Sequence, residues 1–255
     1  MLRLHRIEHD GRPHYAAERD GRWRLVDGDI FGTWREGADV DPEDLVRLAP
    51  VEPSKIVCVG LNYRDHAAEQ QKPLPDEPLI FLKPSTSVIG PGEAIAIPAW
   101  AGRVDYEAEL GVVIGKPAFQ VPLNRAAEHI LGLLAVNDVT ARDLQSRDGQ
   151  YTRAQGFDTF APIGPCIAVG LDGRDLQVRA YVNGDLRQDS RTRELIFTIP
   201  ELVQFISSVM TLLPGDIIST GTPAGVGPIR PGDQVTVHVE GVGALTNSVV
   251  AREGA

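Results

Sequence analysis

Three carboxylate residues stand at the ends of two apolar segments of this sequence. Glu107 and Glu109 lead into the apolar run 110–114, and Asp138 follows the run 131–136. Side chains alternate across a strand, so Glu107 and Glu109 are predicted to point to the same side. Neighbouring carboxylates repel each other, and burial makes their charge more costly unless a cation is bound. Three carboxylates without a nearby thiolate or imidazole favour a hard cation, Mg2+ or Mn2+.

Two glutamates spaced in this way more often form the solvated face of a strand, so the interpretation as a site depends on other residues. His66 and Glu69 follow the apolar segment 55–60 and are spaced i, i+3 in a segment of helical pattern. A carboxylate beside a histidine fixes the imidazole tautomer and raises its basicity, which suits a general base. The alternative is an exposed pair on a helix surface.

Two basic residues extend the candidate site. Lys83 follows the predicted strand 79–82. It either holds an anionic substrate or faces solvent, and its spacing does not distinguish these two alternatives. Arg142 lies just past Asp138, with Gln145 at i, i+3 from it. A guanidinium in that place suits a substrate carboxylate, which it can bind through two hydrogen bonds. The alternative is a surface network of Arg142 and Asp143.

The glycine-rich segment 220–228 follows a predicted strand but fits neither common phosphate-binding motif. It lacks the Gly-Lys-Ser/Thr of a P-loop, and no helix with a downstream acidic residue follows it, as a dinucleotide-binding fingerprint requires. Its backbone N–H groups can still form a concavity that holds a carboxylate.

The elements that must position these residues are mainly strands. One clear helix begins at the capping box Thr198-Ile199-Pro200-Glu201 and continues with apolar residues at helical spacing. A short helix capped by Asn124 is predicted to reach Ile130, and 150–165 is predicted to be a loop. Strands rarely alternate with helices, so we predict a mostly β fold with some α and a mixed core, not a doubly wound sheet. Apolar or alternating runs predict strands at 55–60, 79–82, 107–114, 131–138, 176–181, 216–219 and 235–239, and residues 88–97 are predicted to form a strand pair or a bend around Gly90-Pro91-Gly92.

Residues 1–52 are predicted to form a small β-rich domain that precedes a larger domain, residues 53–255. Pro50 and Pro53 mark the boundary between them. His5 and His14 in the first domain are interpreted as surface residues and not as ligands. The first domain also contains three dipeptides typical of hairpin turns, Asp10-Gly11, Asp20-Gly21 and Asp27-Gly28.

The composition indicates a globular protein and limits its partners. The 255 residues carry a formal net charge of −10, which argues against nucleic acid or an anionic membrane as partner. A small anionic substrate remains compatible with this charge. Cys58 and Cys166 stand in apolar runs, as buried free thiols of a reducing compartment do. The N-terminus lacks a signal-peptide pattern and no apolar run approaches membrane-spanning length, so we expect a cytoplasmic protein.

Five segments of the chain together resemble the fumarylacetoacetate hydrolase family, and they occur in the family's order between residue 55 and the end of the chain. Residues 1 to about 50 resemble the small N-terminal extension of many bacterial members. The resemblance implies a β-roll catalytic core and a homodimer. The matching segments are Val59-Gly60-Leu61-Asn62-Tyr63-Arg64-Asp65-His66, Phe81-Leu82-Lys83-Pro84-Ser85-Thr86, Tyr106-Glu107-Ala108-Glu109-Leu110-Gly111, Asn137-Asp138-Val139-Thr140-Ala141-Arg142-Asp143 and Thr220-Gly221-Thr222-Pro223-Ala224-Gly225-Val226-Gly227.

The resemblance also implies roles for individual residues. Mg2+ or Mn2+ would be held by Glu107, Glu109 and Asp138. His66, paired with Glu69, would transfer the proton. The residues implied around the substrate are Lys83, Arg142, Gln145 and Thr222.

One position departs from the family pattern. Relatives that hydrolyse carbon–carbon bonds often carry a lysine just before the Gly156-Phe157 pair, where this chain has Gln155. Glutamine can donate a hydrogen bond to a developing oxyanion but brings no charge. This difference favours an activity other than hydrolysis.

The resulting hypothesis is a metal-dependent enzyme that acts on 2-oxo or 2-hydroxy-dienoic dicarboxylates of aromatic catabolism. The metal would chelate the substrate carboxylate and the adjacent 2-oxygen and stabilise an enolate, while His66 moves the proton. Within the family, we expect the branch of 2-hydroxyhepta-2,4-diene-1,7-dioate isomerase and 5-carboxymethyl-2-hydroxymuconate isomerase-decarboxylase. Acylpyruvate hydrolysis and oxaloacetate decarboxylation are the alternatives. A protein that binds a dicarboxylate or a metal without turnover is the alternative of another class.

Overall fold

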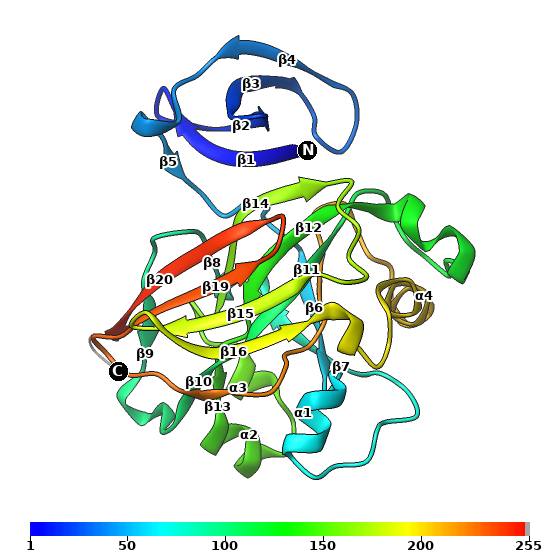
Figure 1. Ribbon diagram of the computed structural model, residues 1–255, viewed down its shortest axis with the longest axis vertical. Coiled ribbons are helices and arrows are strands. Elements are labelled where there is room, and N and C mark those ends of the chain that lie inside the picture. The colour runs from blue at the N-terminus through cyan, green and yellow to red at the C-terminus, as the bar shows by residue number, and fades with distance from the viewer. Residues whose placement is uncertain (253–255) are drawn as a thin grey trace.

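Two facing β-sheets make up most of the structure (Figure 1). The computed structural model describes residues 1–252. In spatial order, the large sheet contains β4 (Trp34–Asp39), β3 (Arg22–Gly28), β2 (Arg12–Arg19), β1 (Leu2–His9), β14 (Ala161–Val169), β12 (Ile130–Asn137), β11 (Ala108–Ile114), β17 (Ile217–Ser219), β6 (Lys55–Gly60) and β7 (Leu79–Pro84). Beside this path lie β5 (Val46–Arg47), which pairs with β1, and β8 (Val88–Ile89), which pairs with β14.

The second sheet covers one face of the large sheet. Its strands, in spatial order, are β16 (Asp185–Arg191), β15 (Gln177–Val182), β19 (Gln234–Val239), β20 (Gly243–Ala251) and β9 (Ile95–Ile97). A small third sheet consists of β13 (Thr140–Ala141), β10 (Val104–Tyr106) and β18 (Gly227–Pro228). The prediction of a mostly β fold with a mixed core is confirmed.

β11 and β12 are neighbours in the inner part of the large sheet and run antiparallel, with Ala108 opposite Asn137. All residues of β11 are buried, as its continuous apolar sequence predicts for a strand covered on both faces. Gly111 has no room for a side chain, since a Cβ there would lie 2.5 Å from Leu134 Cδ1 and 2.6 Å from Val136 Cγ2. The two side chains of β12 therefore pack directly over the backbone of β11.

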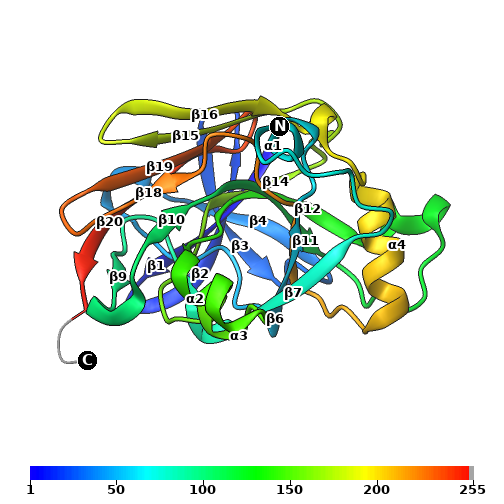
Figure 2. The same ribbon diagram turned by 90° about the horizontal axis from the view of Figure 1, so that it is seen from below.

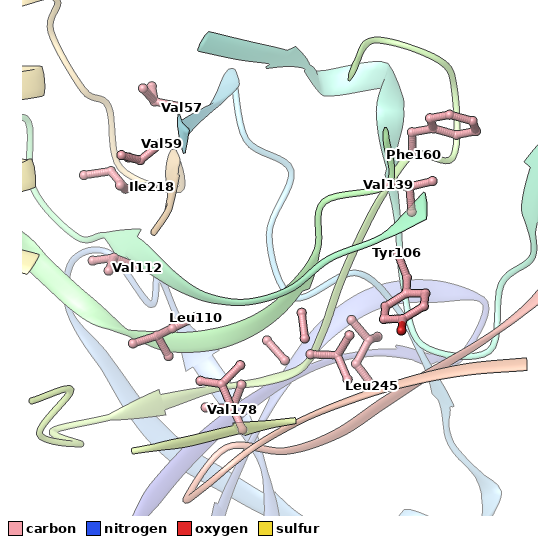
Figure 3. Close-up of a cluster of buried hydrophobic side chains, with 14 of the residues drawn as sticks. Val57, Val59, Tyr106, Leu110, Val112, Val139, Phe160, Val178, Ile218 and Leu245 are labelled. Carbon is pink, nitrogen blue, oxygen red and sulfur yellow. The ribbon is translucent and has the colours of Figure 1, made fainter. Parts of the chain in front are cut away.

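The main hydrophobic core lies between the two sheets (Figure 3). Leu110 and Val112 of β11 enter it from the large sheet, while Val178 of β15 and Leu245 of β20 enter it from the second sheet. These side chains are at most 1% exposed. Burial of this apolar surface is the main favourable contribution to folding, and it fixes the strands that end at the site described below.

The N-terminal strands continue the large sheet (Figure 1). Leu2–Leu4 of β1 pair with Ile167–Val169 of β14, and Leu4 belongs to the same apolar cluster as Ile56 and Val113. The first segment thus shares hydrogen bonds and core with the rest of the chain, and its division at residue 52 stays a prediction.

The expected surface position of His5 is wrong. His5 is 3% exposed, because its ring stacks on Trp23 at 3.9 Å between centroids and Nε2 lies 3.0 Å from Glu18 Oε2. His14 is half-buried. Of the three dipeptides, Asp10-Gly11 and Asp20-Gly21 form the predicted hairpin turns with positive φ at both residues. Gly28 instead ends β3, and the turn follows it.

Four α-helices lie among the described residues, and α2 and α3 lie close together (Figure 2). No helix within residues 1–252 is long and apolar enough to cross a membrane. The capping box predicted at Thr198 is present at the start of α4. The α-helices are α1 (Arg64–Glu69), α2 (Arg142–Asp148), α3 (Thr152–Gln155) and α4 (Ile199–Val209), and the 3-10 helices are η1 (Pro42–Asp44), η2 (Ser85–Ser87), η3 (Ala99–Ala101), η4 (Leu123–His129) and η5 (Thr192–Glu194).

Three local expectations differ from the structure. The segment near Asn124 is the 3-10 helix η4, which begins after Pro122 and has no side-chain cap. Residues 150–165 are not all loop, because they contain α3 and the start of β14. Of the strand pair or bend expected at 88–97, the pair is wrong, because β8 pairs with β14 and β9 pairs with β20. In each case, contacts with distant segments decide the conformation.

The core between the sheets predicts a large cost for truncating Leu245. Leu245→Ala should lower the free energy of unfolding by about 2–5 kcal/mol, because the lost side chain leaves a cavity that the two sheets cannot close. Leu186→Ala, at a side chain that is 50% exposed, should change it by less than about 0.5 kcal/mol. Urea unfolding of both variants measures this difference, and equal losses would contradict the assignment of the core.

Candidate active site

Strand pairing brings the three predicted carboxylates together. Glu107 and Glu109 lie at the start of β11, and Asp138 directly follows β12, so the antiparallel pair places them at one end. The Asp138 N–H donates to the Glu107 carbonyl at 2.9 Å. One oxygen from each of the three carboxylates lies within 4.8 Å of the others, and all three residues are buried.

Each carboxylate is held by donors from another segment. Glu109 Oε2 accepts hydrogen bonds from Ser219 Oγ at 2.5 Å and from the Gly221 N–H at 2.9 Å. Lys83 Nζ lies 2.6 Å from Asp138 Oδ1. Arg142 donates from Nη2 to Glu107 Oε1. These contacts fix the direction of the carboxylates.

Burial makes the charge of these carboxylates costly. It raises the pKa of Glu107 to about 7, although the Arg142 guanidinium acts in the opposite direction. It raises the pKa of Glu109 well above its ordinary value, and the charges of Asp138 and Glu107 add to this effect. A divalent cation would relieve the repulsion, and three carboxylate oxygens at this spacing suit a hard cation. The donor set therefore fits the predicted Mg2+ or Mn2+.

Lys83 lies behind the carboxylates and not on the wall of the cavity. Its side chain is fully buried, and besides Asp138 it contacts the Val139 carbonyl at 3.0 Å and Gln155 Oε1 at 2.6 Å. An ammonium group has three N–H donors, and the three protein oxygens account for them. The solvent-facing alternative is wrong for Lys83, and its geometry is that of a charge partner for Asp138.

The glycine-rich segment after β17 holds a carboxylate of the chain itself. The carboxylate that the Gly221 N–H binds belongs to Glu109. Gly221 has φ +98°, and a Cβ there would lie 2.8 Å from Asn62 Cβ, so this conformation requires glycine. Thr222 Oγ1 donates to the Ala108 carbonyl at 3.0 Å and accepts from Gln188 Nε2 at 2.9 Å. Its hydroxyl therefore anchors the segment against β11.

His66 and Glu69 form the predicted pair on α1. His66 Nδ1 lies 3.0 Å from Glu69 Oε2, and Nε2 lies 2.7 Å from Gln70 Nε2. Since a carboxylate only accepts and the amide nitrogen only donates, the ring carries its proton on Nδ1 and its lone pair on Nε2. Burial lowers the pKa of His66 below its ordinary value, although the hydrogen bond that the ring donates to Glu69 opposes this change. The neutral imidazole that a base requires is thus favoured.

Arg142 and Gln145 lie together on α2 at the edge of the carboxylate group. Arg142 Nη1 donates to Gln145 Oε1 at 3.0 Å, and Nε donates to Asp105 Oδ2 at 2.9 Å. The alternative of a surface network with Asp143 is wrong for Arg142, whose guanidinium contacts Asp105 and Glu107 instead.

A cavity of about 720 Å³ connects these groups. The predicted residues on its wall are His66, Glu69, Glu107, Glu109, Asp138, Arg142, Gln145, Gln155 and Thr222. The structure therefore brings together all predicted site residues, with Lys83 directly behind them. Their roles in binding and catalysis stay predictions.

Four residues that support the site were not predicted from the sequence. Gln70 contacts His66, Asp105 holds Arg142, Ser219 holds Glu109, and Gln188 of β16 holds Thr222. Asp105 had a signal, because it stands two residues before Glu107 and so shares its side of the strand. The other three side chains carry no pattern that points to the site.

Comparison with known proteins identifies the family. Residues 55–250 match the family of the fumarylacetoacetate (FAA) hydrolase C-terminal region. The chain belongs to the fumarylacetoacetate hydrolase family. The structure of 2-hydroxyhepta-2,4-diene-1,7-dioate isomerase from Mycobacterium marinum is 45% identical, with a TM-score of 0.92 and coverage of 100% of both chains.

Other relatives are named for different reactions. The mitochondrial oxaloacetate tautomerase FAHD2B of Bos taurus is 43% identical over 216 residues, which cover 80% of this chain and 69% of that protein. The structure of fumarylpyruvate hydrolase from Pseudomonas aeruginosa in complex with Mn2+ and pyruvate is 36% identical, with a TM-score of 0.73 and coverage of 77% of this chain and 89% of that one. The named relatives are thus enzymes that isomerise, tautomerise or hydrolyse small substrates.

The geometry of the carboxylates predicts the effect of neutralising them on cation binding. Glu109→Gln and Glu107→Gln should each weaken Mg2+ binding by more than about 100-fold, because loss of a residue that only orients a metal ligand already costs about 10–100-fold. Isothermal titration calorimetry measures the affinity.

Glu128→Gln is the matched control for this prediction. It removes the same charge from an exposed side chain that pairs with Arg125 outside the cavity, and it should leave Mg2+ affinity unchanged. Equal Mg2+ affinity in wild type, Glu107→Gln and Glu109→Gln would show that the ion binds elsewhere.

Proposed function

We propose that this chain is a divalent-metal-dependent enzyme that moves a proton in 2-oxo or 2-hydroxy-dienoic dicarboxylates. The reaction that we propose is isomerisation or decarboxylation of compounds of the 2-hydroxyhepta-2,4-diene-1,7-dioate type. The observation that carries the proposal is that three buried carboxylates and the His66–Glu69 pair line one cavity. A divalent cation held by the carboxylates supplies the positive charge that stabilises an enolate of the substrate.

His66 is suited to move the proton. Its Nδ1–H donates to Glu69, so the basic atom of the ring is Nε2, which accepts a hydrogen bond from Gln70, and both residues line the cavity. Glu69 is itself held by the Gly225 N–H, which donates to its Oε1 at 3.1 Å. The carboxylate thus fixes the ring from one side and stabilises the imidazolium that forms when Nε2 accepts a proton.

Arg142, Gln145 and Gln155 are suited to bind the oxygens of the substrate. Arg142 brings a guanidinium to the edge of the carboxylate group, and Gln145 orients it. Gln155 accepts from Lys83 and Thr140 through Oε1, so its Nε2 remains as the donor group of the amide. A neutral donor in this position stabilises a developing oxyanion less than a lysine does, which favours proton transfer within the substrate over hydrolytic cleavage.

The relatives support this choice and also the second candidate. The isomerase from Mycobacterium marinum is 45% identical to this chain, whereas the fumarylpyruvate hydrolase from Pseudomonas aeruginosa is 36% identical. The oxaloacetate tautomerase of Bos taurus makes tautomerisation of a shorter 2-oxo dicarboxylate the second candidate. Both candidate reactions use the same enolate and the same proton-moving residue.

The test of the proposed function is identification of the products by NMR. The purified protein is incubated with a 2-hydroxy-dienedioate, oxaloacetate and an acylpyruvate, once with Mg2+ and once with EDTA. Double-bond migration or loss of CO2 from the dienedioate that requires Mg2+ is the expected result. Exclusive cleavage of the acylpyruvate to pyruvate would make the chain a hydrolase, and no reaction of any substrate would favour a binding protein without turnover.

Removal of the imidazole should affect turnover and leave cation binding intact. His66→Ala should lower kcat by about 10²–10⁴-fold, the usual contribution of a general base. Mg2+ affinity should stay within about twofold of wild type, because His66 does not hold the ion. Steady-state kinetics and calorimetry on the same preparation measure both values. Unchanged turnover would assign proton transfer to another residue.

The pH profile tests the environment of His66. At saturating Mg2+, activity should be lost as the pH falls through the pKa of His66, which burial places below the ordinary value of 6.5. Glu69 raises this pKa, so Glu69→Gln should move the acid limb of kcat/KM to still lower pH. An acid limb above pH 7, or one that Glu69→Gln does not move, would contradict this assignment.

A further inference from the structure

Arg103 is a cationic residue on the cavity wall that the proposed proton transfer does not use. It directly precedes β10, and its side chain is 53% exposed. Its guanidinium binds Asp105 through two hydrogen bonds, from Nε to Oδ1 at 2.8 Å and from Nη2 to Oδ2 at 3.1 Å. A guanidinium has five N–H donors, so three of them remain for another acceptor.

Asp105 holds two guanidinium groups at the same time. Its buried carboxylate also accepts from Arg142 Nε at 2.9 Å. One negative charge thus orients two positive charges that line the same cavity. An arginine fixed in this way loses less conformational entropy when it binds an anion than a mobile side chain does.

The backbone of Arg103 is also fixed. Its N–H donates to Asp143 Oδ2 at 3.1 Å, and its carbonyl accepts from the Arg142 N–H at 2.8 Å. The preceding Gly102 has φ +71°, and a Cβ there would lie 2.2 Å from Asp143 Oδ2. The turn that presents Arg103 is therefore built by the first residues of α2, the helix that also carries Arg142.

Arg142 links Arg103 to the carboxylate group. The Arg142 guanidinium binds Asp105 through Nε and Glu107 through Nη2, and the Arg103 guanidinium lies against the same Asp105 carboxylate. Arg103 is therefore separated from Glu107 by one carboxylate and one guanidinium along the wall of the cavity. A diacid with one end at the carboxylate group can direct its other end toward Arg103.

We propose that Arg103, positioned by Asp105, binds the second carboxylate of an oxo-diacid whose 2-oxo end lies at the Glu107–Glu109–Asp138 group. The inference rests on the proposed function and adds the residue that binds the far carboxylate of its substrate. The other two cations on the wall are Arg142, whose guanidinium binds Glu107 and Asp105, and Lys72, which stands on the exposed loop that follows α1.

The test measures binding of stable ligands to the Mg2+-loaded protein by calorimetry. 2-Oxoadipate is the diacid probe, and 2-oxohexanoate is the monoacid of the same chain length. Oxalate reports the anchoring end alone. Arg103→Gln should weaken the binding of 2-oxoadipate by about 10–100-fold, the usual effect of removing a charged hydrogen-bond donor. The affinities for 2-oxohexanoate and oxalate should stay within about twofold of wild type. Arg103→Lys should restore part of the loss, because the charge returns without the two-point contact to Asp105.

The matched control is Lys72→Gln, which removes one positive charge from the other part of the cavity wall and should not change the ratio of the two affinities. Equal weakening of diacid and monoacid in Arg103→Gln would show a structural effect and overturn the proposal. A loss of diacid binding in Lys72→Gln but not in Arg103→Gln would assign the second carboxylate to the loop and also overturn it. Failure of oxalate to bind wild type in an Mg2+-dependent way would instead contradict the proposed function.

Discussion

The repulsion among three buried carboxylates is the constraint on which the site depends. Glu107, Glu109 and Asp138 place oxygens within 4.8 Å of one another, and all three residues are buried, which makes negative charge costly. The surrounding residues reduce this cost one carboxylate at a time. Lys83 lies against Asp138, Arg142 binds Glu107, and the Ser219 hydroxyl and Gly221 N–H bind Glu109. A divalent cation bound by the three carboxylates would complete the compensation.

The order of strands in the large sheet makes this arrangement possible. β11 begins, and β12, β17 and β6 end, at the same edge, because β11 pairs antiparallel with β12 and β17 while β6 runs parallel to β17. Four segments that are distant in sequence therefore deliver their polar residues to one place: the glutamates, Asp138, the glycine-rich segment and α1 with His66. The apolar core between the sheets fixes the strands, so the positions of the charged groups follow from packing.

The sequence predicted the parts of the site that depend on local spacing. The period of two placed Glu107 and Glu109 on one side, and i, i+3 spacing placed His66 beside Glu69. It did not predict the direction of Lys83, because a strand pattern cannot tell a lysine behind a carboxylate from one in solvent. The same limit explains His5, which is buried by stacking on Trp23, and Gln188, which reaches Thr222 from a strand of the second sheet. These contacts join different segments of the chain, so local spacing in the sequence does not reveal them. The mostly β fold, in contrast, was predicted from the density of apolar runs and turn residues.

The most direct measurement of the central claim is anomalous diffraction from crystals grown with Mn2+. The account predicts an anomalous peak at coordination distance from Glu107, Glu109 and Asp138, with Lys83 still against Asp138. Crystals of Glu109→Gln grown in the same way should lose most of that peak. A peak at another cluster of the chain, or full occupancy in Glu109→Gln, would contradict the view that these three carboxylates are held together for a cation.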